Sequence, residues 1–458
     1  MFRRRRTFPH CPAVIAGFED RVLLAAVQVN STPGPRGTVN LTLTGTPDDD
    51  LVILRRDANN HVHVSGSQFS WNGRADVSEL VFPLVNDLVF NLGAGNDSGI
   101  FDAPKGNVTI HDGAEGDAYS NYRMETGPSA APQRMGSLKA TFDHGTAYLV
   151  METIGSSLTI RDININLVST DSSSVYLGAL GTTQLNVTGA LKINSPEAVE
   201  SRDSVSIFAV PAPSGTSSSK AQPRAKVNLG GGTEINLGGG NDYVNMSGAV
   251  SSRRRTVLNL GEGDDEVAIL HTGAVPNLSD ALLIQGPLIV NLGNGMNRMT
   301  LSAAEGVNRT RVQGPVTITS GRQADVVQIS GTDIRGDLTI NMGFSDPIEG
   351  LQSPDFVALT ASDVAGKTQI TAGGPAEVFL GWNPFGSPRS SELRFEKEVN
   401  VAIGSGEPRV GSPDGPDVIF NSAQNFTGLA SQIIVIYQGN VVADPTQRHL
   451  MNAILLFR

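Results

Sequence analysis

The residues best suited to chemistry in this sequence are aspartates that end short glycine-rich turns. Asp97 ends the stretch Leu-Gly-Ala-Gly-Asn-Asp, Asp242 ends Leu-Gly-Gly-Gly-Asn-Asp, and Asp265 ends Leu-Gly-Glu-Gly-Asp-Asp. Carboxylate and carbonyl oxygens are the ligands that Ca²⁺ prefers, and glycine lets the backbone turn tightly around an ion. Asp97, Asp242 and Asp265 are therefore the candidate metal ligands, and Ca²⁺ is the candidate cofactor.

The same turns also have a structural interpretation. Asn and Asp side chains hydrogen-bond to nearby backbone in tight turns, whereas Ca²⁺ needs about six to eight oxygens at once. Asp242 and Asp265 are 23 residues apart, and Asp97 is further away still. Because the turns are isolated from one another along the chain, the pattern favours turn capping over metal binding.

A search for a catalytic site leaves no residue in that role. The motif set that resembles polygalacturonases is incomplete, because Asp264 and Asp265 lie within a repeated turn and Asp143-His144-Gly145 precedes them in the wrong order. His61 and His63 alternate on one strand face, but no third metal ligand is marked. We therefore predict a non-enzymatic protein, with a polysaccharide lyase or glycoside hydrolase as the alternative.

Short alternating strands must position these turns. One strand precedes each turn and a second follows it, and this unit recurs at 89–97, 235–244, 258–267 and 290–297. A two-strand unit cannot bury its apolar face alone, so it must stack on its own copies. We predict an all-β fold, a parallel β-helix or β-solenoid of about a dozen coils spaced ~4.8 Å apart. An array of β-sandwiches is the alternative.

Composition agrees with many short strands and with few helices. The chain has 51 Gly and 25 Pro, and only 5% of its residues are aromatic. Its net charge of −11 repels phosphate backbones, so no nucleic-acid partner is expected. Arg253–Arg255 form the one basic cluster inside the body, which reads as a solvated strand start. No apolar stretch approaches the ~20 residues of a transmembrane helix.

The first 26 residues differ from the body. Four arginines at Arg3–Arg6 are followed by Phe-Glu-Asp-Arg-Val-Leu-Leu at Phe18–Leu24. This combination resembles the LEPR-XLL segment of large bacterial surface proteins, in which long β-repeat bodies follow at the cell exterior. The resemblance implies an export segment and an extracellular or cell-surface location in bacteria. The alternative is an amphipathic N-terminal arm of a cytoplasmic protein.

The glycine-rich turns carry a second resemblance. Their Gly-x-Gly-Asn-Asp pattern is similar to the RTX-like (hemolysin-type calcium-binding) repeats, in which Ca²⁺ lies between stacked coils. The resemblance covers only the turns. It implies a calcium-stabilised repeat with Asp97, Asp242 and Asp265 as the ligands.

These observations divide the chain into three parts and suggest one function. Residues 1–26 are the export or targeting segment, 27–380 the solenoid body, and 381–458 a C-terminal capping region. Loop insertions are expected near 118–145 and 211–224, where the strand rhythm breaks. We predict an exported adhesion or matrix protein whose partners are a surface polysaccharide or other surface proteins.

Overall fold

A computed structural model describes most of the chain between residues 26 and 443. The residues that it leaves undescribed are 1–25, 67, 72–73, 78, 114–118, 127–130, 169, 196–200, 212–224, 272–281, 305–308, 345–353, 382–392, 406–407, 411–417, 421–423, 429–433, 438–439 and 444–458. The expected export segment lies almost wholly outside the described residues. The same holds for nearly all of the insertion expected at 211–224.

The described chain winds through three strand-bearing faces, in the same order in every full coil. The first face contains β2 (Val39–Thr44), β8 (Val85–Gly93), β10 (Val108–Asp112), β13 (Leu138–Phe142), β16 (Ile163–Leu167), β19 (Leu191–Asn194), β22 (Thr233–Asn236), β25 (Thr256–Asn259), β28 (Leu288–Asn291), β31 (Val316–Thr319), β34 (Leu338–Met342), the start of β37 (Thr368–Leu380), β39 (Val399–Ser405) and β42 (Gln424–Gly428).

The second face follows across a sharp corner. It contains β3 (Leu51–Arg56), β9 (Ser98–Asp102), β11 (Tyr119–Glu125), β14 (Gly145–Thr153), β17 (Thr170–Gly181), β20 (Arg202–Pro211), β23 (Tyr243–Gly248), β26 (Glu266–His271), β29 (Arg298–Ala303), β32 (Val326–Ser330), β35 (Asp355–Thr360), the end of β37, β40 (Pro408–Val410) and β43 (Ile434–Tyr437).

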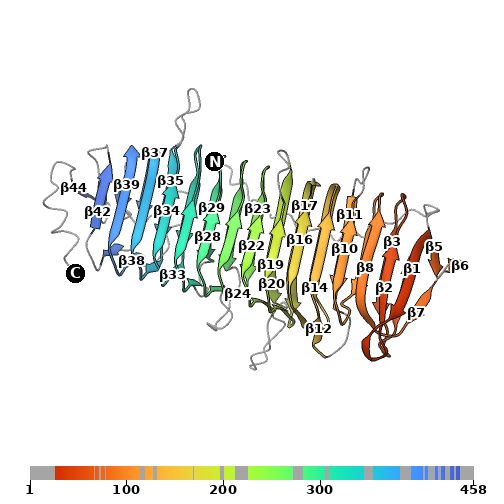
Figure 1. The fold of residues 1–458 in the computed structure, drawn as a ribbon. Coiled ribbons are helices and arrows are strands. Elements are labelled where there is room, and N and C mark those ends of the chain that lie inside the picture. Colours follow the sequence, from red (N-terminus) through yellow and green to blue (C-terminus); the bar gives the residue numbers. More distant parts are fainter. Residues whose placement is uncertain are drawn as a thin grey trace, which may run out of the picture.

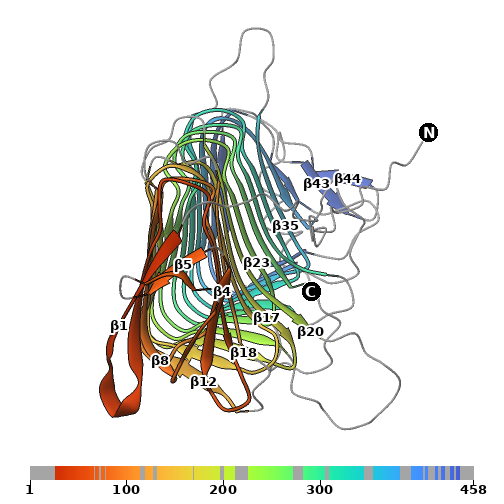
Figure 2. The same cartoon turned by 90° about the vertical axis from the view of Figure 1, so that its right-hand side faces the viewer.

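The third face closes each coil with a short strand. It contains β12 (Gln133–Met135), β15 (Leu158–Ile160), β18 (Gln184–Val187), β21 (Lys226–Leu229), β24 (Val250–Ser252), β27 (Leu283–Ile284), β30 (Thr310–Val312), β33 (Thr332–Ile334), β36 (Asp363–Val364), β38 (Leu393–Phe395) and β41 (Val418–Phe420). Figure 1 shows successive coils side by side along one axis, and Figure 2 looks nearly along that axis.

Pairing between neighbouring coils is parallel and in register. Ile235 of β22 lies beside Leu258 of β25, which lies beside Val290 of β28. The predicted parallel β-helix is therefore confirmed, and the β-sandwich array is wrong, because sandwiches are built from antiparallel strands. Among the described residues the one helical element is a 3₁₀ turn, η1 (Pro35–Gly37), and no helix is long and apolar enough to cross a membrane.

Antiparallel pairing occurs at the two ends of the described stack. At the N-terminal end β1 (Ala26–Pro33) pairs with β2, and the segment between β3 and β8 forms β4 (Val62–Gly66), β5 (Gln68–Trp71), β6 (Arg74–Val77) and β7 (Leu80–Phe82). At the other end β43 pairs with β44 (Asn440–Ala443). Antiparallel hairpins at a stack end pair backbone groups that the end coil would otherwise leave open.

Alternation of apolar and polar residues places the core inside the coils. In β16, Ile163, Ile165 and Leu167 are buried, and the residues between them are not. The inward side chains of all three faces join one apolar cluster that runs from Val27 to Ile403. Each coil thus covers the apolar edge of its neighbour, which is the stacking that the repeats predict.

Close backbone contact explains the repeated glycines of the corner. Gly261 has φ 103°, and a Cβ placed there would lie 1.5 Å from the carbonyl oxygen of Gly238 in the preceding coil. At Gly293 the corresponding distance, to the oxygen of Gly261, is 1.6 Å. A side chain is excluded at this position by both conformation and space.

Two expectations about the body need correction or extension. The stretch 118–145 is not an inserted loop, because it contains β11, β12 and β13 of a regular coil. In β11 the side chains of Ser120, Tyr122 and Met124 point inward, and because Ser120 is polar the alternation of apolar and polar residues is weak there.

Parallel pairing also continues past residue 380 through β38, β39 and β42, so the coils do not end where the sequence pattern changes. Arg253–Arg255 are exposed just before β25, as predicted.

Candidate functional site

A column of buried polar residues runs through the corner between the first and second faces. Its members come from different coils but share one register position, and we call it the acid column: Asp50, Asp97, Asp203, Asp242, Asp265, Asn297, Asp325 and Asp355. Each of these side chains is at most 2% exposed. Between Asp97 and Asp203 the same position is held by Ser120, Ala147 and Ser173, which are also buried.

From Asp97 on, side chains of the acid column accept a hydrogen bond from a backbone N–H of the preceding coil. The N–H of Asp203 donates to Oδ1 of Asp242 at 2.8 Å, and the N–H of Asp242 donates to Oδ1 of Asp265 at 2.8 Å. The pattern continues through Asn297 at 2.9 Å and Asp325 at 2.9 Å. The column therefore ties consecutive corners together.

Burial makes these carboxyls weak acids. Desolvation raises the pKa of Asp242 to about 8 and that of Asp265 to about 7. Desolvation, with the neighbouring carboxyl of Asp112, raises the pKa of Asp97 to about 9. The Oδ2 atoms of all three are buried and have no hydrogen-bond partner among the described residues. These aspartates accordingly hold protons near neutral pH.

The three predicted calcium ligands all belong to the acid column. Asp242 and Asp265 occupy neighbouring coils, whereas Asp97 lies far along the axis toward the N-terminal end. Each uses one carboxyl oxygen to hold a backbone N–H. In the described part of the chain no three His, Cys, Asp or Glu residues gather in a way that could hold a metal ion. These residues therefore do not by themselves supply the oxygen set of a Ca²⁺ site, and calcium binding stays an untested hypothesis from the sequence.

His61 and His63 lie close to carboxylates of the N-terminal hairpins. His63 Nδ1 lies 2.8 Å from Glu79 Oε1, and its Nε2 lies 3.5 Å from Asp57 Oδ2. His61 Nδ1 is 3.6 Å from the same Asp57 oxygen. Contact with Glu79 and Asp57 raises the pKa of His63, which favours its charged form. The pair is a surface ion cluster of the N-terminal hairpins.

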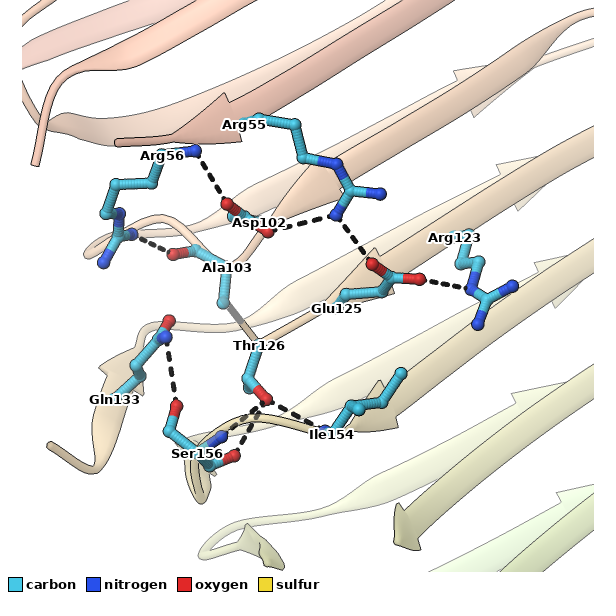
Figure 3. Close-up of polar contacts among 10 residues, drawn as sticks. All are labelled: Arg55, Arg56, Asp102, Ala103, Arg123, Glu125, Thr126, Gln133, Ile154 and Ser156. Atoms are coloured by element: carbon cyan, nitrogen blue, oxygen red, sulfur yellow. Dashed lines mark hydrogen bonds and ion pairs between the residues drawn. The ribbon is translucent and has the colours of Figure 1, made fainter. Parts of the chain in front are cut away.

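A chain of ion pairs crosses the outer surface of the second face near its N-terminal end (Figure 3). Arg55 contacts Asp102 at 3.3 Å and Glu125 at 2.6 Å. Arg123 contacts Glu125 at 2.7 Å and Glu152 at 3.1 Å. Two arginines and three carboxylates thus pair across four coils, and the acids of this chain of ion pairs exceed its cations by one.

Beside this chain of ion pairs lies a pocket of about 730 Å³ whose charged lining residues are cationic. We call it the basic pocket. Among the described residues, four cationic side chains and no carboxylate line it, and two amide side chains complete its polar wall: Arg36, Arg56, Lys105, Arg134, Asn86 and Gln133. Its volume lies within the range of about 300–1,000 Å³ that small-molecule sites occupy.

Two buried polar groups of the basic pocket lack a partner among the described residues. Arg56 donates through its guanidinium to the carbonyl of Ala103, but its Nε–H has no acceptor. Gln133 is only 9% exposed; its Nε2 donates to Ser156 Oγ at 3.1 Å, while its Oε1 has no donor (Figure 3). An unpaired buried polar group costs about 1–3 kcal/mol, and the acid column carries such atoms as well.

The fold creates this pocket where the third face begins. The connection from β9 to β10 spans only residues 103–107, and β12, the first strand of the third face, pairs with β15 alone. Arg36 reaches the pocket from η1 with φ 57° and ψ 39°, a left-handed conformation that is uncommon outside glycine. Strained residues of this kind gather at functional sites.

Comparisons with other proteins add nothing to this geometry. No family model, curated protein or solved structure matches the chain.

Sequence reasoning found part of the acid column and none of the basic pocket. Asp203 and Asp355 lack the glycine-rich turn, and their signal is an aspartate directly before an alternating strand. Arg36, Arg56 and Arg134 lie on three separate segments. No local pattern joins them, because only the coil geometry brings them together.

Proposed function

We propose that this chain is a non-enzymatic structural rod of the bacterial cell surface or extracellular matrix, acting in attachment. The observation that carries the proposal is the acid column, in which the carboxylates of the glycine-rich turns hydrogen-bond to the backbone of a neighbouring coil. A β-helix enzyme would instead be expected to present its acids together in an open groove.

An outer ladder of amides supports the same reading. Asn236 Nδ2 donates to Asn194 Oδ1 at 2.8 Å, and Asn259 Nδ2 donates to Asn236 Oδ1 at 2.6 Å. The ladder continues through Asn291 to Thr319 Oγ1, which donates to Asn291 Oδ1 at 2.6 Å. Polar side chains thus hold neighbouring coils together outside as well as inside, which suits a stiff spacer.

The rod has this reinforcement without disulfides. The sole cysteine, Cys11, lies in the expected export segment. Small extracellular proteins commonly rely on disulfides, whereas here ladders of backbone and side-chain hydrogen bonds perform that task. The LEPR-XLL-like segment at Phe18–Leu24 supports a location outside the cell.

Fractionation of the source cells tests the location. We expect the protein in the surface and medium fractions, with accessibility to an added antibody on intact cells. Removal of residues 1–26 is expected to retain it in the cytoplasm. A full-length protein found wholly in the cytoplasm would overturn the proposal.

The basic pocket favours one second function, a polysaccharide lyase. Such enzymes need a cation near the uronate carboxylate and a basic side chain near the sugar, and Arg56 and Lys105 line one pocket. Incubation with polygalacturonate, followed by ultraviolet absorbance of unsaturated products, separates the two. We expect no product; product formation that Arg56→Met abolishes would establish the enzyme.

A further inference from the structure

The basic pocket is lined by positive charge, although the chain as a whole is negatively charged. The whole chain carries a net charge of −11, yet Arg36, Arg56, Lys105 and Arg134 line this pocket, and none of its described wall residues is a carboxylate. The ion pairs formed among the described residues engage Arg55 and Arg123 nearby but none of these four. The neighbouring acid Asp102 contacts Arg55 and accepts the backbone N–H of Arg56 at 2.7 Å. A ligand that enters this pocket therefore meets unbalanced positive charge.

The cations define the ligand further. A planar guanidinium suits a carboxylate, and Arg36, Arg56 and Arg134 each bring one to the wall of the pocket. A neutral sugar would leave these cations unbalanced. The ligand is therefore an anion, and a sugar that bears a carboxylate is the acidic form of the surface polysaccharide named by the proposed function.

We propose that the basic pocket binds a uronic-acid residue of an acidic polysaccharide. Its carboxylate pairs with the guanidinium groups that line the pocket. Arg36, Lys105 and Arg134 are exposed and surround it with positive charge that also meets the neighbouring uronates. This inference rests on the proposed attachment function and names its partner.

The position of the pocket explains how a rod would use it. Arg56 ends β3, and Gln133 and Arg134 belong to β12, so the pocket lies near the N-terminal end of the stack. Figure 3 shows Arg56 and Gln133 on either side of Ala103. The polymer is thereby held at one end of the rod, and the remaining coils stay free to space it from the cell or from other partners.

Isothermal titration calorimetry with a galacturonic acid trimer tests the proposal on the full chain. We expect saturable binding that weakens with added salt. Arg56→Met is expected to weaken it at least tenfold. Because Arg56 is half-buried and its loss could affect folding, the exposed pair Arg36→Ala with Arg134→Ala gives an independent arm, for which we also expect about a tenfold loss.

The matched control is Arg253→Ala with Arg254→Ala, which removes the same charge from an exposed site far along the rod. It should leave the Kd unchanged. Equal losses in both pairs, or no saturable binding by the unaltered chain, would overturn the proposal. So would equal affinity for a neutral or a sulfated galactose trimer. Cell location is measured separately, so a cytoplasmic protein would reject the proposed function without affecting this binding result.

Discussion

The backbone N–H of Asp242 donates to Oδ1 of Asp265, 23 residues later in the chain and one coil further along the axis, at 2.8 Å. The same bond recurs between Asp265 and Asn297 at 2.9 Å. A carboxyl in this position links the corners of two neighbouring coils through a hydrogen bond. We therefore expect its protonation state to change the free energy of unfolding, and so to make stability depend on pH.

The first prediction concerns pH. The pKa of Asp97 rises from 3.8 to about 9 on folding and that of Asp242 to about 8, so the folded chain binds more protons than the unfolded chain between about pH 4 and 9. Stability from this column is full below about pH 4 and is lost as pH rises through the folded pKa values, by about 1.4 kcal/mol per pKa unit. Thermal melting should show Tm falling from pH 6 to pH 9. A Tm that rises over this range would contradict it.

The second prediction replaces one aspartate of the acid column with asparagine, the residue that already occupies this position at 297. Asn297 occupies the acid column, and its Nδ2 donates to the carbonyl of Gly295 at 3.1 Å. Asp265→Asn keeps the Oδ1 acceptor and removes the titration, so we expect higher stability at pH 9 and a flatter pH profile. Asp265→Ala, the control, loses the acceptor and should cost about 1–3 kcal/mol at every pH. Equal behaviour of the two variants in denaturant titrations would refute the role of Oδ1.

The third prediction concerns the glycine corner. Gly261→Ala places a Cβ about where the carbonyl oxygen of Gly238 lies, and it also strains a positive φ. We expect a loss of about 3 kcal/mol or more in the free energy of unfolding. Gly181 has φ 69° with no atom within 4 Å of its would-be Cβ, so Gly181→Ala should cost only about 1 kcal/mol. Similar losses for both would remove crowding as the reason for the repeat.

The fourth prediction concerns calcium. Because Asp97, Asp242 and Asp265 are engaged with backbone N–H groups, we expect millimolar Ca²⁺ to change neither the strand content nor the Tm at pH 7. Circular dichroism during a Ca²⁺ titration, with a chelator as control, checks this. A saturable rise in Tm that Asp265→Asn abolishes would instead establish the RTX-like site.

Much of the fold follows from local pattern. In β16 the alternation of Ile163, Ile165 and Leu167 with polar residues specifies a strand with one inward face. The glycines before Asp242 and Asp265 specify tight corners, and their spacing specifies the coil. The exceptions, such as β11, are coils whose inward positions include polar residues like Ser120. There the period-2 signal is weak although the backbone pairs normally.

Sequence alone thus determined short alternating strands with glycine-hinged corners, because strand periodicity and turn chemistry are properties of neighbouring residues; it favoured the parallel solenoid, and the pairing of the coils decided against the β-sandwich array. Only the tertiary structure decided that Asp242 and Asp265 turn inward, since that depends on the backbone N–H of an adjacent coil. It likewise assembled Arg36, Arg56 and Arg134 around one pocket, because residues far apart in the chain meet only once the coils are stacked.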